Sequence, residues 1–272
     1  MAYYIMDDDY KIYYEEYGTE HPESIVFVHG HGGRLQYFHH QLEELQNRYH
    51  VVAYDLRGHG ASEKTVKNLD MLRLGKDLHG LIKYLGLKKP TIVGWSLGSN
   101  VVLSCLMQYG YENVRSVVTI DNSPKMINDA DWKYGAFADI REALDFWENS
   151  AKSWKEYASA FVPVFFGEGE RDEEDYRFVE ETYPDNTNDT MLPLLISNNM
   201  LDFRPALKQM PVPYMITYGT RPSFYAPETI MGIAKECVPG CRVEGFDGGH
   251  TAFLQDWEHF NQVLDEFIQG RK

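Results

Sequence analysis

Cysteine is scarce in this chain of 272 residues, which contains three, at Cys105, Cys237 and Cys241. Three cysteines cannot form a disulfide framework, and Pro239 and Gly240 break any helical face that the last two could share. No cysteine and histidine spacing typical of a zinc site accompanies them. The cysteine content therefore indicates a protein of a reducing compartment whose fold depends on its hydrophobic core.

Basic residues are also in the minority. The chain has 26 lysines and arginines against 41 aspartates and glutamates, which gives a formal net charge of −15. Such a field repels the phosphate backbone of nucleic acids and anionic lipid surfaces, so neither is an expected partner. The simplest role of the charge is solubility.

Long apolar runs are missing as well. The longest apolar stretches have the length of a strand, so no membrane-spanning helix is expected. Residues 1–9 carry neither a basic segment nor an apolar run, and no secretory signal is predicted there. We therefore expect a cytoplasmic protein of a size that one α/β domain often reaches.

The chain does contain a regular alternation of strand-like and helix-like segments. Short apolar or β-rich runs predict strands at residues 3–6, 11–16, 24–28, 50–54, 91–93, 114–120, 214–218 and 242–246. Helical periodicity predicts helices at residues 35–49, 69–85, 97–109, 227–236 and 253–268. This alternation favours an α/β fold, with a mostly parallel, twisted sheet covered by helices on both faces.

The alternation is interrupted between residues 122 and 205. This segment has no convincing buried strand, but it has aromatic-rich helical stretches such as residues 139–154. Its acidic run at 168–175 is predicted to be a solvated loop, which would disfavour anionic substrates if it faced the entrance to a site. We predict a core domain made of residues 1–121 and 206–272, with residues 122–205 as a helical cap insertion.

A serine between glycines carries the strongest chemical signal, in the pentapeptide Gly94-Trp95-Ser96-Leu97-Gly98. A predicted strand precedes it and a predicted helix follows it. In this context a tight turn presents the serine hydroxyl at the edge of the sheet, and glycines are needed because side chains would clash. The serine could simply cap the helix, but both glycines and the strand–helix context favour Ser96 as a nucleophile.

A serine hydroxyl needs a base that removes its proton. His250 follows Gly248 and Gly249 in the loop between the last predicted strand and the last predicted helix. Two glycines in a flexible turn would let this histidine point across the sheet edge toward Ser96. This position favours His250 as the base over the other histidines, although any of them could be a surface residue.

A second glycine-rich loop, His29-Gly30-His31-Gly32-Gly33, closes the predicted strand at 24–28. Its glycines let backbone amides approach a ligand, so the amide of His31 is expected to join that of Leu97 in an oxyanion hole. The histidines of this loop, together with His39 and His40, also suggest a metal site. No carboxylate or further ligand lies at a matching spacing, and the sequence therefore predicts no metal.

Taken together, these motifs resemble those of the α/β-hydrolase superfamily, in its esterase and haloperoxidase-like branch with a helical cap. His29-Gly30 resembles the oxyanion loop, residues 94–98 the nucleophile elbow, and Gly249-His250 the histidine loop. Residues 55–62 are similar to a structural turn of the family, and residues 201–213 to the segment that leads from the cap into the next strand. The resemblance covers nearly the whole chain and implies an α/β-hydrolase fold, a fold that hosts many chemistries.

One departure from the family pattern concerns the acid of the triad. Most members carry an aspartate after the strand that follows the cap, but residues 219–228 contain none, and Pro222 stands at the usual place. Asp121, at the end of the strand before the cap, is the best substitute, as in haloalkane dehalogenases. The carboxylate there could instead tie down the start of the cap. Glu228 is the alternative acid, and Asp247 is a weaker candidate.

The cap is expected to set the choice of substrate. Most of its aromatic residues should pack between helices, while a few should line the space over the serine and form an apolar acyl or aryl pocket. The candidates for this pocket are Trp95, which is more readily packed than catalytic, and Trp132, Tyr134 and Phe137.

The sequence therefore predicts a serine esterase or lactonase without a cofactor, acting on a small apolar acyl or aryl ester with Ser96, His250 and Asp121. A cofactor-independent oxygenase or non-heme peroxidase of the same fold is the alternative. Ring-cleaving dioxygenases of this superfamily have a histidine before the serine, where this chain has Trp95, which counts against an oxygenase. A non-catalytic ligand sensor is a further alternative, and the intact Ser96 and His250 argue against it.

Overall fold

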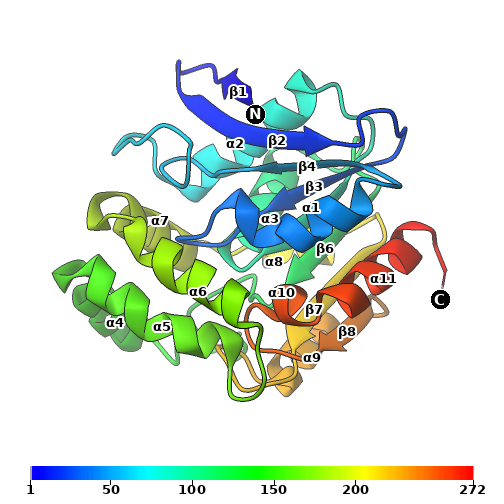
Figure 1. Ribbon diagram of the computed structural model, residues 1–272. Coiled ribbons are helices and arrows are strands. Elements are labelled where there is room, and N and C mark those ends of the chain that lie inside the picture. Colours follow the sequence, from blue (N-terminus) through cyan, green and yellow to red (C-terminus); the bar gives the residue numbers. More distant parts are fainter. Residues whose placement is uncertain (1, 272) are drawn as a thin grey trace.

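A computed structural model describes residues 2–271, which fold around one mixed sheet (Figure 1). The described residues form eight strands, in the order β1-β2-β4-β3-β5-β6-β7-β8. They are β1 Ala2–Ile5, β2 Lys11–Tyr17, β3 Ser24–Val28, β4 His50–Tyr54, β5 Thr91–Trp95, β6 Ser116–Ile120, β7 Tyr214–Gly219 and β8 Arg242–Phe246. All pairs from β4 to β8 are parallel, whereas β1 and β2 run antiparallel at one edge. The prediction of a mostly parallel sheet is confirmed.

Helices cover both faces of this sheet, as predicted. Among the described residues they are η1 Leu35–Phe38, α1 His39–Leu45, α2 Met71–Tyr84, α3 Leu97–Tyr109, α4 Ile140–Lys152, α5 Trp154–Phe166, α6 Glu173–Thr182, η2 Tyr183–Asp185, α7 Asn188–Met200, α8 Arg204–Lys208, α9 Pro227–Cys237, α10 Ala252–Gln255 and α11 Trp257–Ile268. Helices α2, α3, α8 and α9 contribute to one hydrophobic core, and α1 and α11 contribute to the other.

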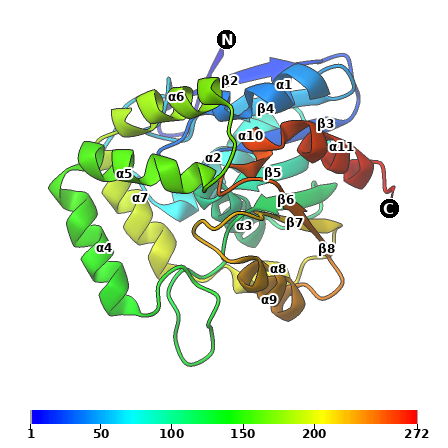
Figure 2. The ribbon, with the colours of Figure 1, turned by 60° about the horizontal axis from the view of Figure 1, so that its bottom comes forward.

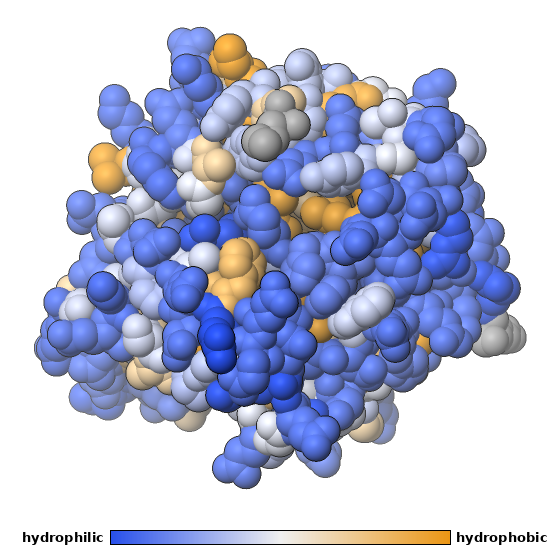
Figure 3. Space-filling view, viewed as in Figure 1, coloured by the Kyte–Doolittle hydropathy of each residue, from blue (hydrophilic) through white to orange (hydrophobic). Residues whose placement is uncertain are grey.

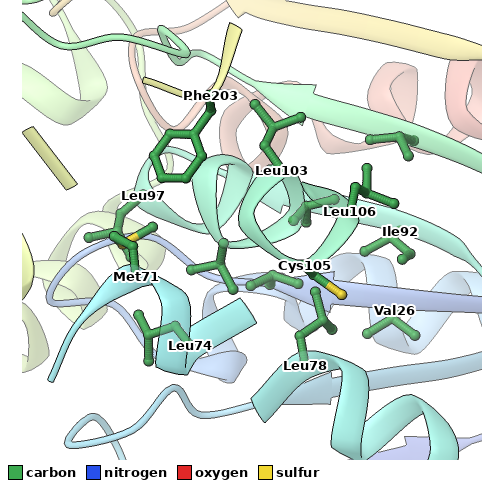
Figure 4. Close-up of a cluster of buried hydrophobic side chains, with 14 of the residues drawn as sticks. Val26, Met71, Leu74, Leu78, Ile92, Leu97, Leu103, Cys105, Leu106 and Phe203 are labelled. Atoms are coloured by element: carbon green, nitrogen blue, oxygen red, sulfur yellow. The ribbon is translucent and has the colours of Figure 1, made fainter. Parts of the chain in front are cut away.

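The central strands β3, β5 and β6 are mostly apolar and buried at every position, because both of their faces are covered. In β3, Ile25 and Phe27 point into the core beside α1 and α11, and Val26 points into the opposite core. Figure 4 shows Val26 and Ile92 on the sheet, with Leu78 of α2 packed nearby. This double burial fixes the sheet, and thereby the positions of the loops at its carboxyl edge.

Two helices that were predicted as continuous are interrupted. The segment 35–49 begins with η1 and its helix α1 ends at Leu45, because Tyr49 lies in the turn toward β4 and donates its hydroxyl to Asp265 at 2.6 Å. The segment 253–268 is divided into α10 and α11 at Asp256, whose backbone leaves the helical conformation.

Helices α4 to α7 stand between β6 and β7 in the chain and gather on one side of the core (Figure 2). They correspond to the predicted helical insertion, and its boundaries at residues 122 and 205 stay a prediction.

The prediction of a solvated loop for residues 168–175 is wrong in its last part. Asp172 caps helix α6 by accepting the backbone N–H groups of Glu174 at 2.8 Å and Asp175 at 3.0 Å. Negative side chains are favoured in a first helical turn, so the acidic run starts a helix. Asp175 is buried beneath it, beside two histidines.

The surface is predominantly polar. Figure 3 shows hydrophilic side chains over most of one face, with small separate apolar patches between them. Within residues 2–271, every helix is too short or too polar to cross a lipid bilayer.

Candidate active site

Ser96 lies on the sharp turn between β5 and α3. Its φ of 53° and ψ of −125° are strained for a residue with a side chain. The backbone N–H of Ser96 donates to the carbonyl of Ile120 at 3.0 Å, which ties the turn to β6. A Cβ on Gly98 would lie 2.2 Å from the carbonyl oxygen of Val28, and a Cβ on Gly94 would lie 2.6 Å from that of Gly98. The turn can form only with glycine at these two places.

His250 and Asp121 meet beneath this turn, and both side chains are buried. The Nδ1–H of His250 donates to Oδ2 of Asp121 at 2.6 Å. Asp121 follows β6 with a φ of 45°, and its backbone N–H donates to the carbonyl of Thr217 at 2.8 Å. Because the carboxylate holds the proton on Nδ1, Nε2 of the neutral imidazole is left as a proton acceptor.

Aromatic side chains hold the imidazole in place. The indole N–H of Trp95 donates to the carbonyl of His250 at 2.8 Å, and the two ring centroids are 5.3 Å apart. Phe165 and Phe224 pack against the same imidazole, with centroids 5.5 Å and 4.7 Å away. Trp95 therefore fixes the histidine loop and also contributes to the wall of the cavity beside it.

The other two candidate acids lie elsewhere. Glu228 is exposed in the first turn of α9, where a carboxylate favours the helix. Asp247 is exposed and accepts two hydrogen bonds from Arg221, each 2.8 Å long. These bonds lower the pKa of Asp247 below its usual value. The structure thus brings Asp121 to His250, and leaves Glu228 and Asp247 at the surface.

The predicted oxyanion loop lies directly against the serine. A Cβ on Gly30 would stand 3.0 Å from the Cβ of Ser96, so this loop approaches as closely as glycine allows. His31 and Leu97 both line the cavity beside Ser96. Leu97 is the first residue of α3, where a backbone N–H has no partner within the helix. The backbone N–H of Leu97 is therefore not used within α3, and the oxyanion role of Leu97 and His31 stays a prediction.

Sequence reasoning missed the histidine that holds this loop. Nε2 of His59 accepts the backbone N–H of Gly32 at 3.0 Å. Burial holds the pKa of His59 well below its ordinary value, so the imidazole stays neutral and keeps its acceptor nitrogen. The sequence indicated only that residues 55–62 form a structural turn, and no local signal shows which loop the turn supports.

Ser96, His250 and the oxyanion loop open into a cavity of about 300 Å³. Its wall is mainly aromatic, and its aromatic residues other than histidine are Trp95, Phe137, Phe146, Trp154, Tyr157, Phe161, Phe165, Tyr183, Phe224 and Tyr225. Of the four pocket candidates, Trp95 and Phe137 belong to this wall.

The other two pocket candidates, Trp132 and Tyr134, lie away from the cavity. The indole N–H of Trp132 donates to the carbonyl of Lys125 at 2.8 Å, and the Arg204 guanidinium stands 5.1 Å from its ring. Tyr134 rests against Gly232 of α9, where its ring occupies the space of a Cβ. The segment that carries both residues folds against α8 and α9 instead of over the serine, so their prediction as pocket residues is wrong.

One wall of the cavity is polar, which sequence reasoning did not find. Asn122, Asn198 and Asn199 line it. Asn100 of α3 donates to Oδ1 of Asn198 at 2.8 Å and accepts from Nδ2 of Asn122 at 2.8 Å. These asparagines come from three separate parts of the chain, and no spacing connects them.

Comparison with known proteins identifies the family. The chain belongs to the family described as alpha/beta hydrolase fold, which matches residues 23–167, and the predicted membership of the superfamily is confirmed.

The relatives below are distant, but they cover nearly the whole chain. A putative non-heme chloroperoxidase of Synechocystis sp. is 27% identical over 271 residues, which are 95% of this chain and 95% of that protein. An esterase from Exiguobacterium antarcticum superimposes with a TM-score of 0.89 at 22% identity, over 98% of this chain and 99% of the esterase. A bromoperoxidase from Bacillus anthracis gives a TM-score of 0.89 at 24% identity, with the same coverage of 98% and 99%. The two structural likenesses establish the fold.

Proposed function

We propose that this protein is a serine hydrolase that cleaves small carboxylic esters or lactones by two-step acyl transfer. The observation that carries the proposal is the 2.6 Å hydrogen bond from His250 to Asp121, beside a cavity that Ser96 also lines. A nucleophile, a base and a carboxylate that orients the base are the three parts that acyl transfer to a serine requires.

In the first step, Nε2 of His250 accepts the hydroxyl proton of Ser96 as Oγ attacks the ester carbonyl carbon. Asp121 stabilises the imidazolium that forms. The amides of His31 and Leu97 donate to the tetrahedral oxyanion, and one such donor contributes about 3 kcal/mol. The imidazolium then gives its proton to the leaving oxygen, and the alcohol departs while the acyl group stays on the serine.

In the second step, His250 removes a proton from water, whose oxygen attacks the acyl carbon. The tetrahedral intermediate collapses, Oγ of Ser96 regains a proton from the imidazolium, and the carboxylic acid leaves. With a lactone, the leaving oxygen remains attached to the acyl group, so the product is a hydroxy acid.

The cavity supports a small, apolar acyl or aryl substrate. A volume of about 300 Å³ is at the lower end of the range for small-molecule pockets. Aromatic walls favour an apolar acyl or aryl group, and the asparagines of the polar wall could hydrogen-bond to one polar substituent.

A fluorophosphonate probe tests the nucleophile, and ester turnover tests the reaction. Folded wild-type protein should be labelled at Ser96, and Ser96→Ala should remove the label and reduce kcat on p-nitrophenyl esters by on the order of 10⁴- to 10⁶-fold. A protein that is not labelled would be a ligand sensor. If Ser96→Ala kept its activity and consumed dissolved oxygen, the protein would be an oxygenase that uses His250 and Asp121.

The names of two relatives support a second candidate, a non-heme haloperoxidase-like activity. Hydrogen peroxide can replace water as the nucleophile that attacks the acyl carbon, which gives a peracid and free Ser96. The peracid can then oxidise a halide and is itself reduced to the carboxylic acid. Halide oxidation that requires hydrogen peroxide, a short carboxylic acid and Ser96 together would support this candidate, and oxidation that persists in Ser96→Ala would oppose it.

A further inference from the structure

Outside the catalytic cavity, two histidines and a carboxylate converge where the core meets the cap. His39 and His40 begin α1, and Asp175 lies in the first turn of α6, on the same side of the molecule (Figure 2). Nε2 of His39 is 3.3 Å from Oδ1 of Asp175, and Nε2 of His40 is 3.0 Å from Oδ2. One ligand atom from each residue lies within 4.8 Å of the other two.

The hydrogen bonds of His39 leave a conflict that a cation would resolve. Nδ1 of His39 is 3.1 Å from the carbonyl oxygen of Gln36, and a carbonyl only accepts, so Nδ1 carries a proton. In the neutral imidazole, Nε2 then has a lone pair, and this lone pair faces a carboxylate oxygen of Asp175. Two acceptors in contact repel each other, unless a proton or a metal ion lies between them.

The three side chains are close enough to share one metal ion. The ring centroids of His39 and His40 are 3.9 Å apart, and the Nε2 atoms of both rings face the carboxylate of Asp175. A metal ion would use the two nitrogens and the carboxylate together. Zinc bonds of about 2.0 Å to nitrogen and oxygen allow two ligand atoms of one ion to lie up to about 4 Å apart. Each histidine nitrogen lies within that distance of one oxygen of Asp175, at 3.3 Å from Oδ1 and 3.0 Å from Oδ2.

The surroundings of the three side chains also fit a metal site. A backbone carbonyl on Nδ1, as Gln36 provides for His39, is the partner that orients most metal-binding histidines. The ring of His40 stacks on Trp257 at 4.7 Å with an interplanar angle of 10°, which restricts its rotation. The Asp175 side chain is 7% exposed and that of His39 is 41% exposed, so the carboxylate is sheltered while an ion can still enter.

We propose that His39, His40 and Asp175 bind one divalent ion of the zinc type, with water in the remaining position. Imidazole and carboxylate ligands suit this class of metal. The ion would join α1 of the core to α6 of the cap. This site is separate from the catalytic residues, and none of its three ligands lines the catalytic cavity.

Titration of the chelator-treated full chain with Zn²⁺ in a calorimeter tests the site. Wild type should bind one ion per chain. Loss of a partner that hydrogen-bonds to a metal ligand lowers metal affinity about 10- to 100-fold, so Asp175→Asn and His39→Gln, which each remove a ligand, should lower the affinity for Zn²⁺ by at least this factor. His259→Gln is the matched control, because His259 is an exposed histidine that hydrogen-bonds to the carboxylate of Asp256 at 3.1 Å. This control should bind as wild type does.

Two further measurements distinguish loss of the metal site from misfolding of a variant. Circular dichroism verifies the fold of each variant, and Zn²⁺ should raise the melting temperature of wild type and of His259→Gln but not of Asp175→Asn. Co²⁺ in place of Zn²⁺ should give the strong visible absorption of a tetrahedral site in wild type and in His259→Gln, but not in Asp175→Asn. Zn²⁺ binding that is equally tight in wild type and in Asp175→Asn, or no saturable binding by wild type, would overturn the proposal.

Discussion

Replacement of Asp121 by asparagine tests the proposed acid most directly. The amide has nearly the same shape as the carboxylate, so the packing around it stays intact. It has no charge to stabilise the imidazolium, and its NH₂ group can face Nδ1 of His250 and hold the wrong tautomer. Since the present hydrogen bond is 2.6 Å long and both side chains are buried, water cannot substitute for the lost charge.

The expected loss is on the order of 10⁴-fold in kcat for Asp121→Asn, the scale at which a triad carboxylate acts. KM should change little, because Asp121 is not among the residues that line the cavity. The assay is steady-state hydrolysis of a panel of p-nitrophenyl esters of graded acyl length. Glu228→Gln serves as the control, since Glu228 is exposed and should leave both constants as in wild type.

A thermal melt of the same variant separates loss of catalysis from loss of fold. Within residues 2–271, no group hydrogen-bonds to Oδ1 of Asp121, although this atom is buried. Since asparagine keeps the shape of the side chain, Asp121→Asn should fold and show one cooperative melt. The assignment of Asp121 is refuted if Asp121→Asn keeps most of its kcat, or if Glu228→Gln is the variant that loses it.

Three further predictions concern the loop, the cavity and the response to acid. Gly30→Ala should lower kcat on the order of 10²-fold, because the new methyl group would stand 3.0 Å from the Cβ of Ser96 and displace the backbone amide of His31. Unchanged steady-state kinetics would contradict this placement of the loop. Phe137 lines the cavity, so Phe137→Ala should shift the substrate preference toward longer acyl chains in the ester panel. Trp132 is buried away from the cavity, so Trp132→Ala should lower the free energy of unfolding by about 3–5 kcal/mol in denaturant without that shift. Burial lowers the pKa of His31 to about 4 from its ordinary value of about 6.5, so only the unfolded state takes up the proton between these values. The contribution of His31 to the free energy of unfolding should therefore fall by about 1.4 kcal/mol per pH unit as the pH drops through this window, and His31→Gln should reduce the slope by that amount in a series of melts.

The sequence predicted elements well where the signal is local. The strands Ser24–Val28, His50–Tyr54 and Arg242–Phe246 and the helix Leu97–Tyr109 have the predicted bounds. Their signals are short buried runs and glycine or proline boundaries, which act through the nearest turns of the backbone. The predicted helix at 253–268 was wrong in its continuity, because the break at Asp256 has no glycine or proline to mark it.

In the candidate site, too, the residues with a local sequence signal were predicted and the others were not. The turn that presents Ser96 and the loop that carries His250 are local motifs, and the sequence was sufficient to identify both. The cavity wall was predicted only in part, because Trp132 and Tyr134 fold against other helices. Phe224 reaches the cavity from a loop far away in the chain, and no periodicity within the cap could identify it.

The sequence alone determined the class of fold and indicated Ser96 and His250 as candidate catalytic residues, since strand–helix alternation and glycine-flanked turns depend on near neighbours. The absence of an aspartate from residues 219–228 also directed attention to Asp121. Only the tertiary structure decided which carboxylate reaches His250. It likewise brought Asp175 to His39 and His40, where sequence spacing had indicated no ligand set. The physical reason is that tertiary packing joins residues more than a hundred positions apart in the chain, and such contacts leave no pattern in the sequence.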